Sequence, residues 1–119
     1  MQQLVVKLTS GADDPERCSQ AFTVTATALA AGVRVSLWLT GEASWFALPG
    51  RAEMFSLPHS PPLSGLRDLI IAGGTLTVCS QCAARRNLLA EDLLPGVRIA
   101  GAATFVEEAL SPDTQALVY

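Results

Sequence analysis

The first 40 residues alternate between strand and helix patterns, and this alternation narrows the possible folds most. Residues 4–8 form a short aliphatic run that predicts a strand. An acidic pair followed by Pro15 predicts the start of a helix, and Gly32 predicts its end. Residues 33–39 alternate in hydrophobicity and predict a second strand. Such a strand, helix, strand unit joins parallel strands through a right-handed crossover.

The alternation continues through the rest of the chain. Further strands are expected at 75–78, 97–100 and 115–118, and helices at 42–48, 63–72, 79–87 and 102–110, with another turn or two within 88–94. The fold class expected is α/β, a three-layer α/β/α sandwich with a mainly parallel five-stranded sheet. Because no linker, repeat or change of composition divides the chain, residues 1–119 are expected to form one domain.

Composition and charge exclude several classes of function. Half of the residues are apolar, yet no run approaches the roughly 18 residues of a membrane span, so we expect the excess to be buried in the sheet and in a homo-oligomer interface. A net charge of −3 without a basic stripe argues against nucleic-acid binding. The N-terminal residues lack the pattern of a signal peptide, and we expect a cytoplasmic protein whose three cysteines remain reduced.

Cys79 and Cys82 form a Cys-x-x-Cys pair where a β-branched strand leads into a helix. The free N–H groups and the dipole at the start of a helix favour a negative charge such as a thiolate. Since the thiolate is the nucleophile, this position predicts a reactive Cys79, with Cys82 as its partner. Cys18 instead lies on the apolar stripe of the first helix and is expected in the core.

Loops at the carboxyl ends of parallel strands usually form the ligand site of such a sheet. The loops expected there are 9–14, 40–44 and 101–104, together with the Cys-x-x-Cys segment. The residues expected to bind substrate are Ser10, Gly11, Ser80, Gln81 and Arg85. No dinucleotide or P-loop signature is present, and no cofactor is expected. His59, the single histidine, lies in a proline-rich loop and is expected to be exposed.

The chain resembles the DsrE/DsrF-like family of small sulfur-relay proteins over most of its length. The resemblance is carried by Val-Arg-Val-Ser-Leu-Trp-Leu-Thr-Gly at 33–41, by Gly-Gly-Thr-Leu-Thr-Val-Cys-Ser-Gln-Cys-Ala-Ala-Arg-Arg-Asn-Leu at 73–88, and by Glu-Asp-Leu-Leu-Pro-Gly-Val-Arg-Ile-Ala-Gly at 91–101. It implies a single DsrE/DsrF-like domain over 1–119 that forms trimers or hexamers. It also implies that Cys79 accepts sulfur as a persulfide, with donor and acceptor proteins or low-molecular-weight thiols as partners.

Two other classes of function stay open at this point. Cys-x-x-Cys at a helix start is also the arrangement of thiol-disulfide oxidoreductases, although the aromatic-Cys-Gly-Pro-Cys surround of thioredoxins is absent. A metal-binding or structural oligomer is the second alternative. A structural zinc takes four ligands, usually as two spaced pairs, whereas one chain offers a single pair, Cys79 and Cys82, besides His59 and at most Cys18. No metal is therefore expected within one chain, although a site shared between subunits would complete the set.

Overall fold

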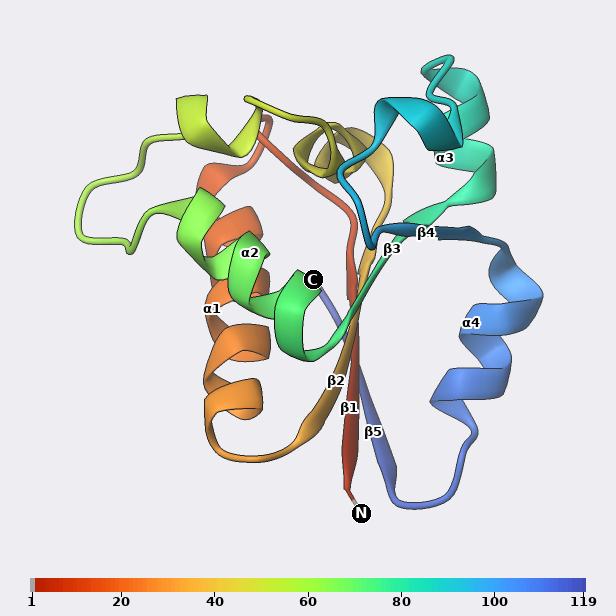
Figure 1. Ribbon diagram of the computed structural model, residues 1–119. Helices are drawn as coiled ribbons and strands as arrows, with labels where there is room; N and C mark the ends of the chain where they lie inside the picture. The colour runs from red at the N-terminus through yellow and green to blue at the C-terminus, as the bar shows by residue number, and fades with distance from the viewer. Residues whose placement is uncertain (1) are drawn as a thin grey trace.

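The protein is built on a five-stranded sheet in the order β4-β3-β2-β1-β5, with every pair of neighbours parallel. The computed structural model describes residues 2–119 (Figure 1). The strands are β1 (Gln3–Leu8), β2 (Arg34–Leu39), β3 (Thr75–Cys79), β4 (Arg98–Ala100) and β5 (Thr114–Val118). The expected α/β fold is confirmed, and the sheet is parallel throughout rather than mainly so.

Helices cover both faces of this sheet. In Figure 1, α1 and α2 lie on one face and α4 on the other, while α3 stands at the end where β3 finishes. The α-helices are α1 (Pro15–Ala30), α2 (Leu63–Gly73), α3 (Ser80–Arg85) and α4 (Ala102–Ala109). Three short 3-10 turns complete the chain, namely η1 (Gly41–Ala47), η2 (Ala52–Met54) and η3 (Ala90–Asp92).

The core lies mainly between the sheet and α1. Cys18, Ala21 and Phe22 on α1 are fully buried, as the apolar stripe of this helix predicts. Neighbouring residues Val5 and Val6 of β1 are also fully buried although they point to opposite faces, because helices cover the sheet on both sides. Gly32, in the left-handed region at φ +88°, ends α1 and turns the chain into β2.

The helix after the Cys-x-x-Cys pair is shorter than its sequence predicts. It was expected to reach about Asn87 but ends at Arg85. Asn87 adopts a left-handed conformation at φ +55°, and the Leu88 N–H bonds back to the Ala83 carbonyl, which turns the chain away from the helix axis. The helix expected at 42–48 is likewise a 3-10 helix, η1, and the turn expected within 88–94 is η3.

A polar network fixes α4 to its face of the sheet. The Glu108 carboxylate accepts hydrogen bonds from the Ser36 hydroxyl at 2.6 Å, the Trp38 indole at 3.0 Å and the Arg98 guanidinium at 2.6 Å. Burial raises the pKa of Glu108, but these three donors outweigh burial and hold that pKa below its usual range. One short helix is therefore held by charge-assisted hydrogen bonds as well as by apolar packing.

The proline-rich segment between β2 and α2 is tied down by one buried arginine. Arg67 of α2 is only 2% exposed, and its guanidinium donates two parallel hydrogen bonds to the Glu53 carboxylate, at 3.0 and 2.8 Å. These hydrogen bonds hold the pKa of Glu53 at about 2, below its ordinary 4.5. The pair connects η2 to α2 and fixes the start of the long loop.

The Glu53 carboxylate makes the stability of the fold depend on acid pH. Because its pKa is lower in the folded than in the unfolded chain, it stabilises the fold above pH 4.5, and this contribution is lost as the pH falls toward about 2. We expect the melting temperature to fall less steeply over this interval in Glu53→Gln than in the unmodified protein. Thermal melts across the pH series test this, with Glu16→Gln, an exposed acid, as the control. Equal slopes in all three proteins would contradict it.

Candidate active site at the carboxyl edge of the sheet

The Cys-x-x-Cys pair lies at the edge of the sheet where the parallel strands end. Because the pairings are parallel, β1, β2, β3 and β4 all deliver their carboxyl ends to this edge. The loops that follow them carry residues 9–14, 40–44, 79–82 and 101–104, as the sequence predicts. Segments far apart in the chain therefore meet around the two cysteines.

Cys79 is the last residue of β3 and the N-cap of α3. Its side chain is partly exposed. Burial raises the pKa of the Cys79 thiol, but the backbone N–H groups of Cys82 and Gln81, the Cys82 thiol and the positive charge of Lys7 all lower it, and the net shift is downward. The structure therefore gives Cys79 the features of a nucleophile.

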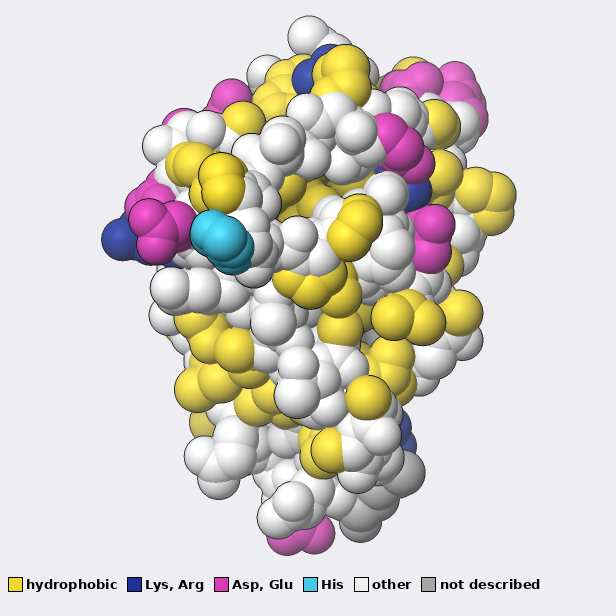
Figure 2. Space-filling view, turned by 90° about the vertical axis from the view of Figure 1, so that its left-hand side faces the viewer, with side chains coloured by type: hydrophobic (Ala, Val, Ile, Leu, Met, Phe, Trp, Pro, Cys, Tyr) yellow, Lys and Arg dark blue, Asp and Glu magenta, His cyan; other side chains and the backbone are white. Residues whose placement is uncertain are grey.

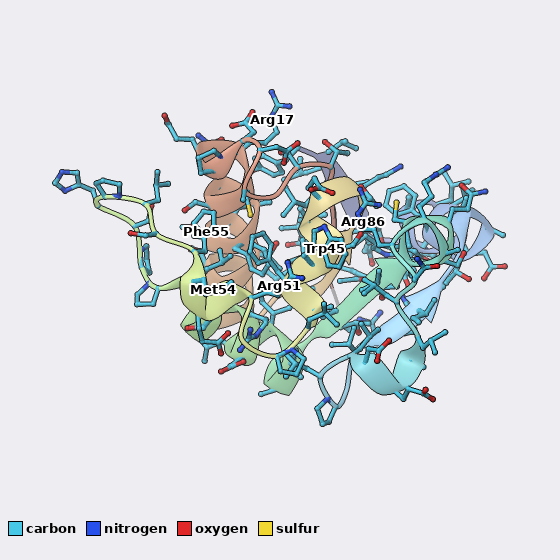
Figure 3. All side chains as sticks on the ribbon, turned by 90° about the horizontal axis from the view of Figure 1, so that it is seen from above. Arg17, Trp45, Arg51, Met54, Phe55 and Arg86 are labelled. Carbon is cyan, nitrogen blue, oxygen red and sulfur yellow. The ribbon has the colours of Figure 1, made fainter. Side chains whose placement is uncertain are left out.

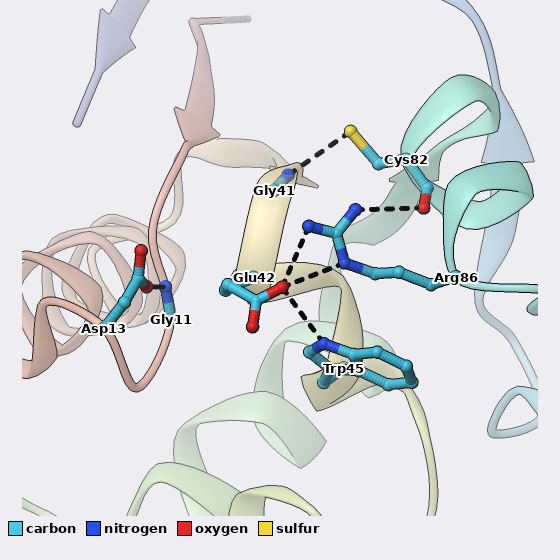
Figure 4. Close-up of polar contacts among 7 residues, drawn as sticks. All are labelled: Gly11, Asp13, Gly41, Glu42, Trp45, Cys82 and Arg86. Carbon is cyan, nitrogen blue, oxygen red and sulfur yellow. Dashed lines mark hydrogen bonds and ion pairs between the residues drawn. The ribbon is translucent and has the colours of Figure 1, made fainter.

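Cys82 is held in a fixed orientation by the loop after β2. Its side chain is buried, and its Sγ accepts a hydrogen bond from the Gly41 N–H at 3.2 Å (Figure 4). Gly41 lies in the left-handed region at φ +56°, and an added Cβ would come within 2.6 Å of the Thr9 carbonyl oxygen. A glycine is thus required at the position that contacts Cys82, a role that the sequence did not reveal.

An ion pair joins α3 to the turn that follows β2. Arg86 donates to the Glu42 carboxylate from Nε at 3.1 Å and from a terminal nitrogen at 2.9 Å, and it also donates to the Cys82 carbonyl at 3.2 Å (Figure 4). The Trp45 indole donates to the same carboxylate oxygen at 3.2 Å. The charge of Arg86 is therefore compensated by Glu42 and braces the cysteine helix.

Ser10 and Gly11, expected to bind substrate, lie in a tightly packed segment of the same edge. Ser10 is buried, and its Oγ has no hydrogen-bond partner within residues 2–119. The Gly11 N–H donates to the Asp13 carboxylate at 2.7 Å, and an added Cβ on Gly11 would lie 2.6 Å from the Glu42 carbonyl oxygen. The segment thus packs directly against the Glu42 turn, with the Gly11 N–H already engaged.

The remaining expected substrate contacts lie on α3. Ser80 is partly exposed and lies against Gly101, where an added Cβ would approach its Oγ to 3.3 Å. Gln81 and Arg85 are exposed. Ser80 and Gln81 directly follow Cys79 in the first turn of α3, whereas Arg85 ends this helix.

Cys18 and His59 belong to α1 and to the proline-rich loop rather than to the Cys-x-x-Cys segment. Cys18 is fully buried within α1, and burial, with the nearby negative charges of Asp13 and Asp14, raises the pKa of its thiol to about 12. His59 is exposed on the proline-rich loop, where it stands out from the surface as the cyan side chain of Figure 2. The expectations of a core Cys18 and an exposed His59 are confirmed.

A hollow of about 310 Å³ lies beside the Glu42–Arg86 pair. The Arg51 guanidinium stacks over the Trp45 ring at 4.6 Å, while Met54 and Phe55 stand on the opposite side (Figure 3). The hollow is lined by Ala12, Glu42, Trp45, Phe46, Arg51, Met54 and Phe55. Its walls are thus mainly aromatic and apolar. Glu42 both lines the hollow and forms the ion pair with Arg86.

Lys7 is the residue of this site that the sequence prediction missed. It contributes to the lowered pKa of Cys79, and its ammonium lies 5.3 Å from the centre of the Phe105 ring. The available signal was a single charge within an otherwise aliphatic strand from Leu4 to Leu8. A charged residue within an otherwise buried strand indicates that its side chain makes polar or charged contacts on one face of the sheet.

The chain matches one known family over almost its whole length. The sequence model of the DsrE/DsrF-like family matches residues 2–115. The chain belongs to this family. At the family level, membership indicates a role in sulfur relay.

Individual relatives extend the comparison. The protein MJ0760 of Methanocaldococcus jannaschii is 27% identical over 116 residues, a match that covers 97% of this chain and 42% of that protein. This DsrE/DsrF-like chain thus spans about two fifths of the length of the curated relative that it matches.

Solved structures share the fold. The ychN protein of E. coli superposes with a TM-score of 0.82 at 17% identity, and protein MTH1491 of Methanobacterium thermoautotrophicum with a TM-score of 0.68 at 14% identity. Both matches cover 100% of each chain.

Two further features bear on the class of site. Within residues 2–119, no three His, Cys, Asp or Glu side chains are grouped so that they would hold a metal ion. In the same part of the chain, no helix has the length and apolar character needed to cross a membrane.

Cys79 and Cys18 are expected to differ sharply in their rates of alkylation. Because the pKa of Cys79 is lowered while burial raises that of Cys18 to about 12, iodoacetamide at neutral pH should alkylate Cys79 first and leave Cys18 unmodified until the chain unfolds. Peptide mass spectrometry after timed alkylation measures each site, and urea-unfolded protein gives the reference rates. Modification of Cys18 before Cys79 in the folded protein would contradict this assignment.

Proposed function

We propose that this protein is a sulfur-relay protein that accepts sulfane sulfur on Cys79 as a persulfide and passes it to another thiol. The observation that carries the proposal is the environment of Cys79, a partly exposed thiol with a lowered pKa at the carboxyl edge of a parallel sheet. Family membership supports sulfur as the cargo. Partial exposure of Cys79 allows a donor or acceptor to reach this residue.

The loading step is a thiolate attack on the outer sulfur of a donor persulfide. A bond forms between the Cys79 Sγ and that sulfur, the sulfur–sulfur bond of the donor breaks, and the donor leaves as a thiolate. No external oxidant or reductant is needed, because sulfane sulfur is transferred between two thiols. A lowered pKa of Cys79 favours this step, since it raises the fraction of thiolate at neutral pH.

The unloading step has two routes. In the first, an acceptor thiolate attacks the outer sulfur of the Cys79 persulfide, and Cys79 leaves as a thiolate. In the second, the Cys82 thiolate attacks the Sγ of Cys79, hydrosulfide leaves, and a Cys79–Cys82 disulfide forms that a further thiol must reduce. The Cys82 thiol is one of the groups that lower the pKa of Cys79, which supports Cys82 as a resolving residue.

The proposed partners are sulfur-donor and sulfur-acceptor proteins or low-molecular-weight thiols, in a cytoplasmic, reducing setting. We also propose a homotrimer or homohexamer. Support comes from apolar side chains left exposed on α4 and β5, with Leu110 80% exposed and Val118 66% exposed. Exposed apolar groups that lie on adjoining elements are typical of surfaces that pack against another chain.

Loading is tested by intact mass after incubation of the reduced protein with glutathione persulfide. We expect the unmodified protein to gain one sulfur atom, because Cys79 carries the reactive thiolate, and Cys79→Ser to gain none. Cys18→Ala is the matched control, since it removes a buried cysteine and should load fully. Cys82→Ser cannot form the Cys79–Cys82 disulfide and should keep its added sulfur. Absence of added sulfur on both the unmodified protein and Cys82→Ser, or full loading of Cys79→Ser, would overturn the proposal.

A thiol-disulfide oxidoreductase is the second candidate, favoured by the influence of the Cys82 thiol on the pKa of Cys79. The two functions differ in turnover, because a persulfide carrier has no reason to reduce disulfides of other proteins. We expect no acceleration of insulin-disulfide reduction by dithiothreitol when the protein is added. Acceleration that disappears in both Cys79→Ser and Cys82→Ser would instead establish the second candidate.

A further inference from the structure

Lys7 and Cys79 lie on the same face of the sheet. The strand register pairs Lys7 with Trp38 and Trp38 with Thr77, so these three side chains share the face that α4 covers. Cys79 follows Thr77 by two residues, and its side chain therefore leaves β3 on this face as well. Two strand spacings, about 10 Å, separate β1 from β3. A long lysine side chain on β1 bridges much of that gap.

The Lys7 side chain is held in place by an aromatic ring. Its Nζ lies 5.3 Å from the centroid of Phe105, in the range of a cation–π contact. Phe105 in turn packs edge-to-face on Trp38, with ring centroids 5.5 Å apart, and Trp38 is only 2% exposed. The ammonium is thus supported by a rigid aromatic stack between β2 and α4.

Two arginines on this side of the molecule are paired with carboxylates. The titratable or charged side chains on or next to the sheet strands, η1, α3 and α4 around Cys79 are Lys7, Arg34, Glu42, Cys82, Arg85, Arg86, Arg98, Glu107, Glu108 and Tyr119. Arg98 pairs with Glu108 at 2.6 Å, and Arg86 pairs with Glu42 at 2.9 Å. Lys7 takes part in none of the ion pairs formed within residues 2–119. Its charge is therefore free to act on the neighbouring sulfur.

We propose that Lys7 is a positioning residue of the sulfur site, whose ammonium faces the Cys79 sulfur and neutralises the anion formed there. The same charge serves two states, the Cys79 thiolate before sulfur arrives and the persulfide anion afterwards. The site is thereby suited to sulfur that is held and passed on as an anion. A role of Lys7 in sulfur transfer rests on the proposed function, whereas the electrostatic effect of Lys7 on the Cys79 thiolate does not.

The test is the pH dependence of Cys79 alkylation by iodoacetamide, followed by peptide mass spectrometry. Lys7→Met keeps an apolar stem against Phe105 but removes the charge, and we expect alkylation at pH 7 to slow about fivefold, with the profile moved to higher pH. Lys7→Arg keeps the charge and should retain the profile of the unmodified protein. Arg34→Met is the matched control, because it removes one positive charge at the amino end of β2 and should leave the profile unchanged.

An unchanged profile in Lys7→Met would overturn the proposal. Equal shifts in Lys7→Met and Arg34→Met would also overturn it, since they would trace the effect to net charge rather than to position. Lys7→Gln provides the same test if the methionine variant does not fold, as judged by its thermal melt. Alkylation requires no sulfur donor, so failure of the unmodified protein to load sulfur would contradict the proposed function while leaving the Lys7 result intact.

Discussion

Parallel pairing of β1, β2 and β3 fixes where the reactive groups of this protein stand. Because all three strands run in one direction, the Thr9–Gly11 segment, the Gly41–Glu42 turn and Cys79 arrive at the same edge. The hydrogen bond from Gly41 to Cys82 and the ion pair from Glu42 to Arg86 both depend on this convergence. A change of strand direction would separate the groups that brace the cysteine helix.

The two faces of the sheet serve different purposes. The α1 and α2 face contains the apolar core, including Cys18, whose burial keeps its thiol protonated. The α4 face is polar and aromatic, and Glu108 joins one short helix to three donors on the sheet. Cys79 and Lys7 lie on this second face, where charge and hydrogen bonding act on the thiol. Separation of the two faces thus separates a buried thiol with a raised pKa from a partly exposed thiol with a lowered pKa.

The charge balance around the cysteines explains how a thiolate is favoured in a chain of net charge −3. Arg86, the C-cap of α3, forms an ion pair with Glu42 and so holds the end of this helix in place. The groups that lower the pKa of Cys79 are instead two peptide N–H groups, the Cys82 thiol and Lys7. Arg85 and Arg86 are near Cys79 in the chain, but the contributing lysine comes from a strand more than seventy residues earlier.

The sequence by itself determined the order and type of the main elements, because hydrophobic period, proline and glycine act locally on the backbone. It also placed Cys79 at a strand end and Cys18 in the core. Tertiary structure alone decided that Gly41 holds Cys82, that Glu42 compensates Arg86, and that Lys7 shares a face with Cys79. Those relations depend on strand order and register, which set distances between residues that no local pattern connects.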